Sequence, residues 1–190
     1  MSLDLSIVIV SWNTKQLLSD CLRTVYTSLQ ETPELKAEVF VADNASADGS
    51  PEMVEQDYPQ TILIRTGANL GFAKANNLAL KQSKGRYWLL LNSDTLVPTG
   101  GIFAALVAAL DAEPKAAVAG PLLLNPDGSV QHNWARFPGL ASELSGELDR
   151  SQAPCPLSDF EDPAKRRQLK PFVCDWVGGA CFLVRAEVAQ

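Results

Sequence analysis

Residues 5–13 read LSIVIVSWN, a β-branched apolar run that ends in a serine, a tryptophan and an asparagine. Such a run is typical of a strand that is buried on both faces of a parallel sheet. Residues 87–94, YWLLLNSD, repeat the pattern, again with polar side chains after the apolar ones. The two stretches predict strands of one sheet, each followed by a polar loop.

Between these stretches the sequence alternates between a strand period and a helix period. Residues 14–30 place apolar side chains at three- and four-residue spacing, which predicts an amphipathic helix. We expect the other strands over residues 39–42, 62–64, 87–91 and 116–119, and the other helices from Ser50, over residues 72–80 with Gly85 as the stop, and over residues 98–112. The alternation predicts an α/β fold, a Rossmann-like, mostly parallel sheet that is joined by right-handed crossovers and flanked by helices.

The second half of the chain has a different character. Residues 139–171 are rich in proline, serine and charged side chains. We expect a surface excursion there, within a single domain that spans residues 1–190. Residues 176–184, WVGGACFLV, return to the composition of a strand.

Composition excludes several classes of protein. Of the 190 residues, 46% are apolar and 20% are charged, as in ordinary globular proteins, and the net charge of −6 disfavours nucleic acid as a partner. Four scattered cysteines and a single histidine disfavour a zinc site and suit a reducing compartment. Because no uncharged stretch reaches the length of a membrane span, we expect no transmembrane segment and a cytoplasmic location.

Polar or glycine residues follow each of the first four predicted strands. These are Ser11-Trp12-Asn13, Asp43-Asn44-Ala45-Ser46, Gly67-Ala68-Asn69-Leu70-Gly71 and Asn92-Ser93-Asp94. Parallel α/β sheets bind their ligands outside the carboxyl ends of the strands. The four segments together therefore predict a ligand site at one edge of the sheet.

Two carboxylates in these segments have specific chemistry. Asp43 can accept hydrogen bonds from a nucleoside, and we favour this role over the alternative of a local turn or a cap for the helix after Ser50, because Asp48 and Ser50 lie nearer that helix. Asp94, two residues after Asn92, can bind Mg²⁺ or Mn²⁺ together with substrate phosphates; the alternative is a simple strand-to-helix turn. Lys74 could reach a phosphate or lie on a solvated helix face.

The motifs SIVIVSWN (residues 6–13), VADNASADGS (41–50), NLGFAKANN (69–77) and LLLNSD (89–94), in this order, resemble the family 2 glycosyltransferases with the GT-A fold. The pieces NPDGSVQ, ARFP and DWVGGACFLVR resemble the branch that transfers rhamnose and related sugars in bacterial cell-surface polysaccharide assembly. The resemblance covers nearly the whole chain, and it is the set of motifs rather than any one of them that is specific.

The resemblance implies a role for each matching residue. The donor-binding residues would be Ser11, Asn13, Asp43, Asn69, Gly71, Lys74, Asn92, Ser93 and Asp94. Asp94 would be the principal ligand of Mg²⁺ or Mn²⁺, since Asn92 replaces the first aspartate of the family's Asp-x-Asp element. Trp176, Gly178 and Gly179 would lie near the acceptor and the transferred sugar. The family's general base would lie beyond Gln190, so the chain resembles an enzyme truncated at its carboxyl end.

The implied reaction moves a sugar, rhamnose-like or a hexose, from a nucleoside diphosphate to a polysaccharide or lipid-linked acceptor, with inversion and metal assistance. A lipid-linked acceptor would place the protein peripherally at the inner membrane face. Two alternatives remain open. The chain could be a non-catalytic fragment that binds sugar nucleotides. It could also be a nucleotidylyltransferase, which is disfavoured because the loop Ser11-Trp12-Asn13-Thr14 lacks the glycine and basic residues of that class.

Overall fold

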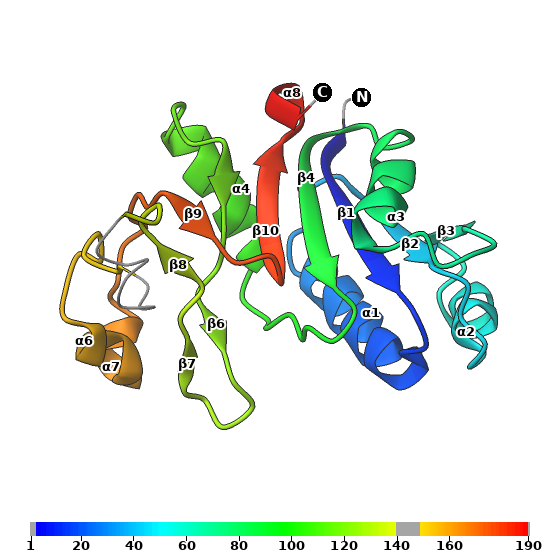
Figure 1. Cartoon of the computed structure of the whole chain (residues 1–190), viewed down its shortest axis with the longest axis horizontal. Coiled ribbons are helices and arrows are strands. Elements are labelled where there is room, and N and C mark those ends of the chain that lie inside the picture. The colour runs from blue at the N-terminus through cyan, green and yellow to red at the C-terminus, as the bar shows by residue number, and fades with distance from the viewer. Residues whose placement is uncertain (1–2, 140–148, 190) are drawn as a thin grey trace. The chain divides into compact units, whose positions relative to one another are not determined.

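The computed structural model describes residues 3–139 and 149–189 and contains a six-stranded sheet (Figure 1). The strand order is β3-β2-β1-β4-β10-β5, in which β1 to β4 are parallel and β10 runs antiparallel to both of its neighbours. The strands of this sheet are β1 (Leu3–Ser11), β2 (Ala37–Asp43), β3 (Ile62–Arg65), β4 (Gly85–Asn92), β5 (Val118–Ala119) and β10 (Cys181–Arg185). The expected mostly parallel α/β sheet is confirmed.

The described residues form two compact units. Unit 1 contains the sheet and comprises residues 1–119 and 179–190; unit 2 comprises residues 120–178. The helices of unit 1 are α1 (Lys15–Gln30), α2 (Ser50–Asp57), α3 (Phe72–Leu80), α4 (Ile102–Ala112) and α8 (Ala186–Ala189). Unit 2 holds β6 (Leu123–Leu124), β7 (Val130–Gln131), β8 (Trp134–Ala135), α6 (Leu157–Glu161), α7 (Pro163–Arg166) and β9 (Trp176–Val177). The single domain inferred from the sequence stays a prediction.

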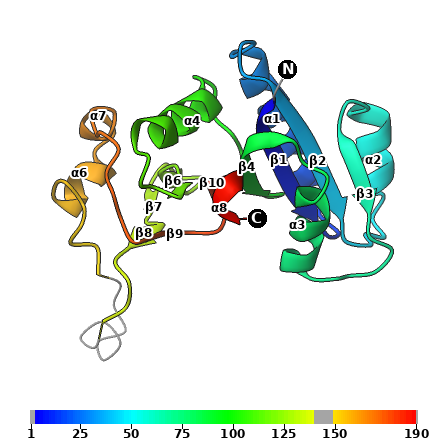
Figure 2. The ribbon, with the colours of Figure 1, turned by 90° about the horizontal axis from the view of Figure 1, so that it is seen from above.

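The sheet of unit 1 is covered on both faces because the direction of its crossovers reverses. The connections from β1 to β2 and from β2 to β3 step one way along the sheet, and the connection from β3 to β4 steps back past β1. Right-handed crossovers then require α1 and α3 to lie on opposite faces, as Figure 2 shows. On the α3 face, Val8 and Phe40 pack against Ala79 of the helix.

The carboxyl ends of β2, β1 and β4 are aligned by the strand register. Ser11 pairs with Asp43, and the preceding Val10 pairs with Asn92 of β4. Strand order reverses between β1 and β4, and such a switch point is where open α/β sheets form their ligand crevice. The polar residues that follow these three strands therefore meet at the edge where a ligand is expected.

Three sequence-based expectations were wrong in detail. Gly85 does not end a helix: α3 ends at Leu80 and Gly85 begins β4, where a Cβ would lie 2.5 Å from the backbone nitrogen of Ser6. Helix α4 begins at Ile102 rather than residue 98, since Gly100 and Gly101 have positive φ angles of 107° and 75°. Residues 176–184 form parts of two strands, β9 and β10, which belong to different sheets.

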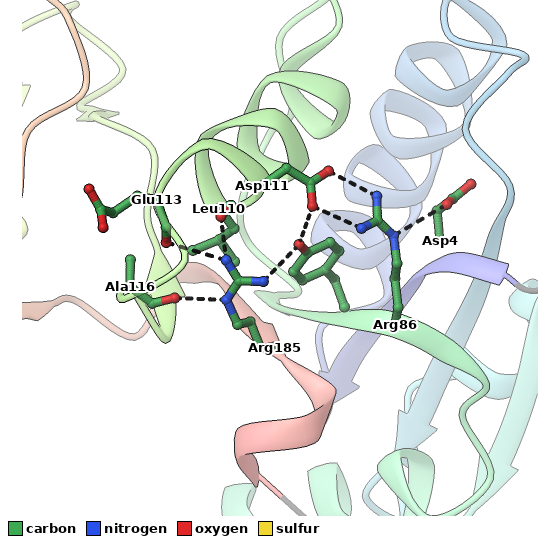
Figure 3. A network of polar contacts seen from close by, with 8 residues as sticks. Asp4, Arg86, Leu110, Asp111, Glu113, Ala116 and Arg185 are labelled. Carbon is green, nitrogen blue, oxygen red and sulfur yellow. Dashed lines mark hydrogen bonds and ion pairs between the residues drawn. The ribbon is translucent and has the colours of Figure 1, made fainter.

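A polar network around Arg185 links β10 to the carboxyl end of α4 and to Tyr87 near the amino end of β4 (Figure 3). The Arg185 guanidinium donates to the carbonyls of Ala116 (2.9 Å), Glu113 (3.3 Å) and Leu110, and to the Tyr87 hydroxyl (3.1 Å). Tyr87 in turn donates to Asp111. The arginine thereby adds a second donor to the carbonyls of Leu110 and Glu113, which also accept from backbone N–H groups, and it donates to the carbonyl of Ala116 in the turn that follows α4.

Two further expectations concern the region after residue 120. The part of the predicted surface excursion that is described, residues 139 and 149–171, lies in unit 2 and contains α6 and α7, whose Phe160 is buried; residues 140–148 lie outside the described residues. Among the described residues, no helix combines the length and the apolar character that crossing a membrane requires.

Candidate functional site

A chain of three hydroxyl groups connects the ends of β1 and β4. The Ser11 hydroxyl lies 2.9 Å from that of Thr14, which lies 3.1 Å from the hydroxyl of Ser93. Ser11 is fully buried and Ser93 is buried. The predicted donor residues Ser11 and Ser93 are therefore brought together, through a threonine that the sequence analysis did not select.

Asp43 combines a local turn with an unused acceptor. Its Oδ2 accepts from the backbone N–H of Ser46 (3.1 Å), which is the turn considered as the alternative role. Its Oδ1 is buried and has no hydrogen-bond partner among the residues that the structure describes, and Asp43 is only 3% exposed. An unpaired buried carboxylate oxygen is costly, so this atom is poised to accept a hydrogen bond from a ligand.

Asn44 is a second residue, besides Thr14, that the sequence analysis did not select. It is buried, and its amide donates to Asn69 Oδ1 (2.9 Å) and accepts from the backbone N–H of Leu70 (2.8 Å). Its own backbone N–H donates to the carbonyl of Ser11. Asn44 thereby fastens the loop before α3 to the ends of β1 and β2. Its place next to Asp43, just beyond the apolar run of β2, was the signal available in the sequence.

The loop before α3 carries the predicted residues Asn69, Gly71 and Lys74. Asn69 Oδ1 also accepts from the N–H of Gly71 (3.0 Å), so the carbonyl end of this amide shapes the loop. Gly71 precedes α3 with φ of 79° and has open space where a Cβ would be, so its backbone conformation is what requires glycine. Lys74 is exposed on α3 and forms no ion pair with any residue in the described ranges.

The loops after β1 and β2 hold each other in left-handed conformations. Asn13 (φ 54°) donates its backbone N–H to Ser46 Oγ and accepts from the N–H of Ala47 through Oδ1. Ala45 (φ 64°) is the other non-glycine residue with positive φ among the described residues. Trp12, between Ser11 and Asn13, is 55% exposed. Strained backbone of this kind concentrates at functional sites, which supports the location of the predicted donor pocket.

Replacing Ala45 by glycine is expected to raise the free energy of unfolding by about 1 kcal/mol, because an alanine pays that cost in the left-handed region and glycine does not. Chemical denaturation of the wild type and the variant checks this value. A matched Ala73→Gly change on the exposed face of α3 should instead lower stability by about 1 kcal/mol. A loss of stability in both variants would contradict the strain at Ala45.

Asp94 is suited to bind a cation with help from a ligand. It is exposed, and it forms no hydrogen bond or ion pair with the described residues. Asn92 is half-buried two residues earlier and offers a second oxygen. Within residues 3–139 and 149–189, no group of three or more His, Cys, Asp or Glu side chains could hold a metal ion. This donor set fits Mg²⁺ or Mn²⁺, which take one or two carboxylates and complete their shell with phosphate oxygens and water.

The residues expected near the acceptor lie after the excursion. In unit 2, Trp176 donates its indole N–H to the carbonyl of Arg136 (3.1 Å), and the N–H of Gly178 donates to the carbonyl of Asn133. A Cβ at Gly178 would lie 3.1 Å from Asn133 Cβ, so a side chain at this position would crowd Asn133. Gly179 belongs to unit 1 and has open space around it. Their roles toward an acceptor stay predictions.

Comparison with known proteins identifies the family of the chain. The model of the family "Glycosyl transferase family 2" matches residues 6–186, so the chain belongs to glycosyl transferase family 2. Over 178 residues the chain is 33% identical to an N-acetylglucosaminyl-diphospho-decaprenol L-rhamnosyltransferase of Mycobacterium tuberculosis, a match that covers 86% of this chain and 57% of that protein. The chain thus spans little more than half the length of this relative.

Solved structures support the fold. The mannosyltransferase PcManGT of Pyrobaculum calidifontis, in complex with GDP-Man and Mn²⁺, superimposes with a TM-score of 0.58 at 26% identity, over 67% of this chain and 37% of its own. TarS 1-349 of S. aureus, in complex with UDP, gives a TM-score of 0.57 at 23% identity, over 70% and 39% of the two chains. These likenesses confirm the expected GT-A fold.

Proposed function

We propose that this protein binds a nucleoside-diphosphate sugar and transfers the sugar to a saccharide or a lipid-linked saccharide. The observation that carries the proposal is the buried, unpartnered Oδ1 of Asp43, which lies at the end of the strand next to Ser11. The exposed carboxylate of Asp94 follows β4, the other neighbour of β1. One edge of the sheet thus offers an acceptor for the nucleoside and a cation ligand for the diphosphate.

In the proposed complex, each residue of the site contacts a particular part of the sugar nucleotide or its cation. Asp43 accepts a hydrogen bond from the base or the ribose, and Ser11 and Asn13 border the nucleoside. Asn69, Gly71 and Lys74 border the diphosphate, where the lysine ammonium offsets negative charge. Asp94, with Asn92 as an auxiliary, holds Mg²⁺ or Mn²⁺, and the bound cation supplies positive charge where the leaving diphosphate accumulates negative charge.

The proposed chemistry is a single displacement with inversion. An oxygen of the acceptor hydroxyl forms a bond to the anomeric carbon as the bond to the diphosphate oxygen breaks, and a base takes the hydroxyl proton. Asp175 is poorly suited to be that base, because hydrogen bonds from the Phe137 N–H and Gln152 hold the pKa of its carboxyl below the usual value. We assign no described residue as the base. We propose that Trp176, Gly178 and Gly179 border the acceptor.

Two relatives bear on the acceptor. One is named a decaprenol-linked rhamnosyltransferase, and a Bacillus spizizenii protein that is 32% identical over 97 residues, 49% of this chain and 15% of its own, is named a poly(ribitol-phosphate) beta-glucosyltransferase. We therefore favour an acceptor of cell-surface polysaccharide assembly. A lipid-linked acceptor would bring the protein to the inner face of the membrane. The alternative is that the protein binds a sugar nucleotide without transferring the sugar.

Titration calorimetry with UDP, dTDP and GDP tests the binding step, with Mn²⁺ present and again after chelation. We expect one of the three to bind and to lose most of its affinity when Mn²⁺ is removed. Incubation with the matching labelled sugar nucleotide and saccharide acceptors then separates transfer from binding alone. Absence of binding by all three nucleotides with Mn²⁺ present would contradict the proposed function.

A further inference from the structure

Helix α1 holds the segment after β4 at several points. The Thr14 hydroxyl contacts Ser93 Oγ (3.1 Å), the Cys21 thiol donates to the carbonyl of Asn92 (3.7 Å), and Thr24 Oγ1 accepts from the N–H of Val97 (3.0 Å). One side of the helix thus follows residues 92–97 from beginning to end. Asp94 lies inside this segment, yet it contributes none of these contacts.

The Thr14 side chain holds the segment after β4 instead of capping its own helix. It occupies the N-cap position of α1, where a threonine side chain ordinarily accepts a hydrogen bond from the first turn of its own helix. Here the side chain makes no such cap, and its hydroxyl is engaged by Ser11 and Ser93. The Asp48 carboxylate caps the amino end of α1 instead, by accepting from the N–H of Lys15 (2.8 Å).

The hydroxyl chain also constrains its own protons. Each of the three hydroxyls carries one proton, and the two contacts within the chain use two of them. One proton is left over: it belongs to Ser11 at one end, to Ser93 at the other, or to Thr14 when both serines donate to it. A ligand that accepts from either end therefore orders the whole chain, with Thr14 at its centre.

We propose that Thr14 is a positioning residue: its hydroxyl fixes Ser93, and with it the Asp94 carboxylate, relative to the end of β1. This inference rests on the proposed function, because it assigns Thr14 to the site that binds the diphosphate and its cation. Thr14 itself need not touch the ligand. Its contribution is the placement of the segment that does.

The test compares Thr14→Val, which keeps the shape but removes the hydroxyl, with Thr14→Ser, which keeps the hydroxyl. Thr14→Val is expected to weaken Mn²⁺-dependent nucleoside diphosphate binding about tenfold and to speed amide exchange at Thr95 and Val97 about tenfold, because the segment loses its anchor. Thr14→Ser should stay close to the wild type in both measurements. Thr27→Val on α1 is the matched control, since the Thr27 hydroxyl bonds only the Arg23 carbonyl of its own helix.

The two measurements separate this inference from the proposed function. If the wild type binds none of the nucleotides, the proposed function fails, and amide exchange still decides whether Thr14 holds the segment. If the wild type binds, equal affinity in Thr14→Val overturns the inference. Unchanged exchange at Thr95 and Val97 in Thr14→Val overturns it in either case, as does an equal effect in Thr27→Val.

Discussion

Replacing Asp94 by alanine is expected to weaken Mn²⁺-dependent binding of the nucleoside diphosphate about 100-fold, as measured by calorimetry. The carboxylate is the one charged side chain in Asn92-Ser93-Asp94, and a divalent cation is held by only one or two carboxylates. A 100-fold loss corresponds to about 2.7 kcal/mol. Affinity measured after chelation of Mn²⁺ should change much less, because the nucleoside contacts at Asp43 remain. The variant therefore separates the cation's share of binding from the nucleoside's share.

The stability of Asp94→Ala should stay within about 0.5 kcal/mol of the wild type, because Asp94 is exposed and makes no hydrogen bond or ion pair with the described residues. Asp57→Ala is a matched control, an exposed aspartate at the end of α2. It should leave both binding and stability unchanged. Equal affinity of Asp94→Ala and the wild type with Mn²⁺ present would exclude Asp94 as the metal ligand.

Replacing Arg185 by methionine is expected to lower the free energy of unfolding by about 3 kcal/mol. Methionine preserves much of the apolar stem but removes the hydrogen bonds that the guanidinium donates to the carbonyls of Leu110, Glu113 and Ala116 and to the Tyr87 hydroxyl. Each hydrogen bond lost at these partly buried positions contributes about 1 kcal/mol. Urea denaturation, with the slope compared between the two proteins, measures the loss.

The control for this substitution is Arg23→Met. Arg23 pairs with Asp20 on the exposed face of α1 at 3.1 Å, and a surface pair of this kind contributes at most about 0.5 kcal/mol. Both arginines belong to unit 1, so one denaturation transition reports on both. A loss below about 1 kcal/mol for Arg185→Met would show that the network in Figure 3 is not a principal support of β10.

The sequence predicted those parts of the fold that local patterns decide. Apolar spacing placed α3 at its observed bounds, residues 72–80, and β-branched runs located the central strands. Gly85 was misassigned because the contact that requires a glycine there comes from the neighbouring strand: β1 approaches so closely that only glycine fits. No local pattern reports such an approach between strands distant in sequence.

In the candidate site, too, local sequence patterns predicted some residues, and only the fold revealed others. Polar residues after apolar strands predicted that the ends of β1, β2 and β4 meet, and the register places Ser11 beside Asp43 and Asn92 beside Val10. Asn44 and Thr14 were not selected, because an asparagine in a turn and a threonine before a helix have ordinary local explanations. Their importance comes from partners that only the fold brings near. The ligand roles of the site residues stay predictions.

The antiparallel strand β10 has a consequence for how the protein is made. It pairs with β4 about 90 residues later in the chain, and unit 2 is synthesised in between. While the ribosome is still translating unit 2, the newly emerged β4 has one unpaired edge, which is a template for aggregation. Joining such distant segments also carries a high loop-closure entropy and slows folding. We expect chaperones to matter most during this interval, before β10 arrives.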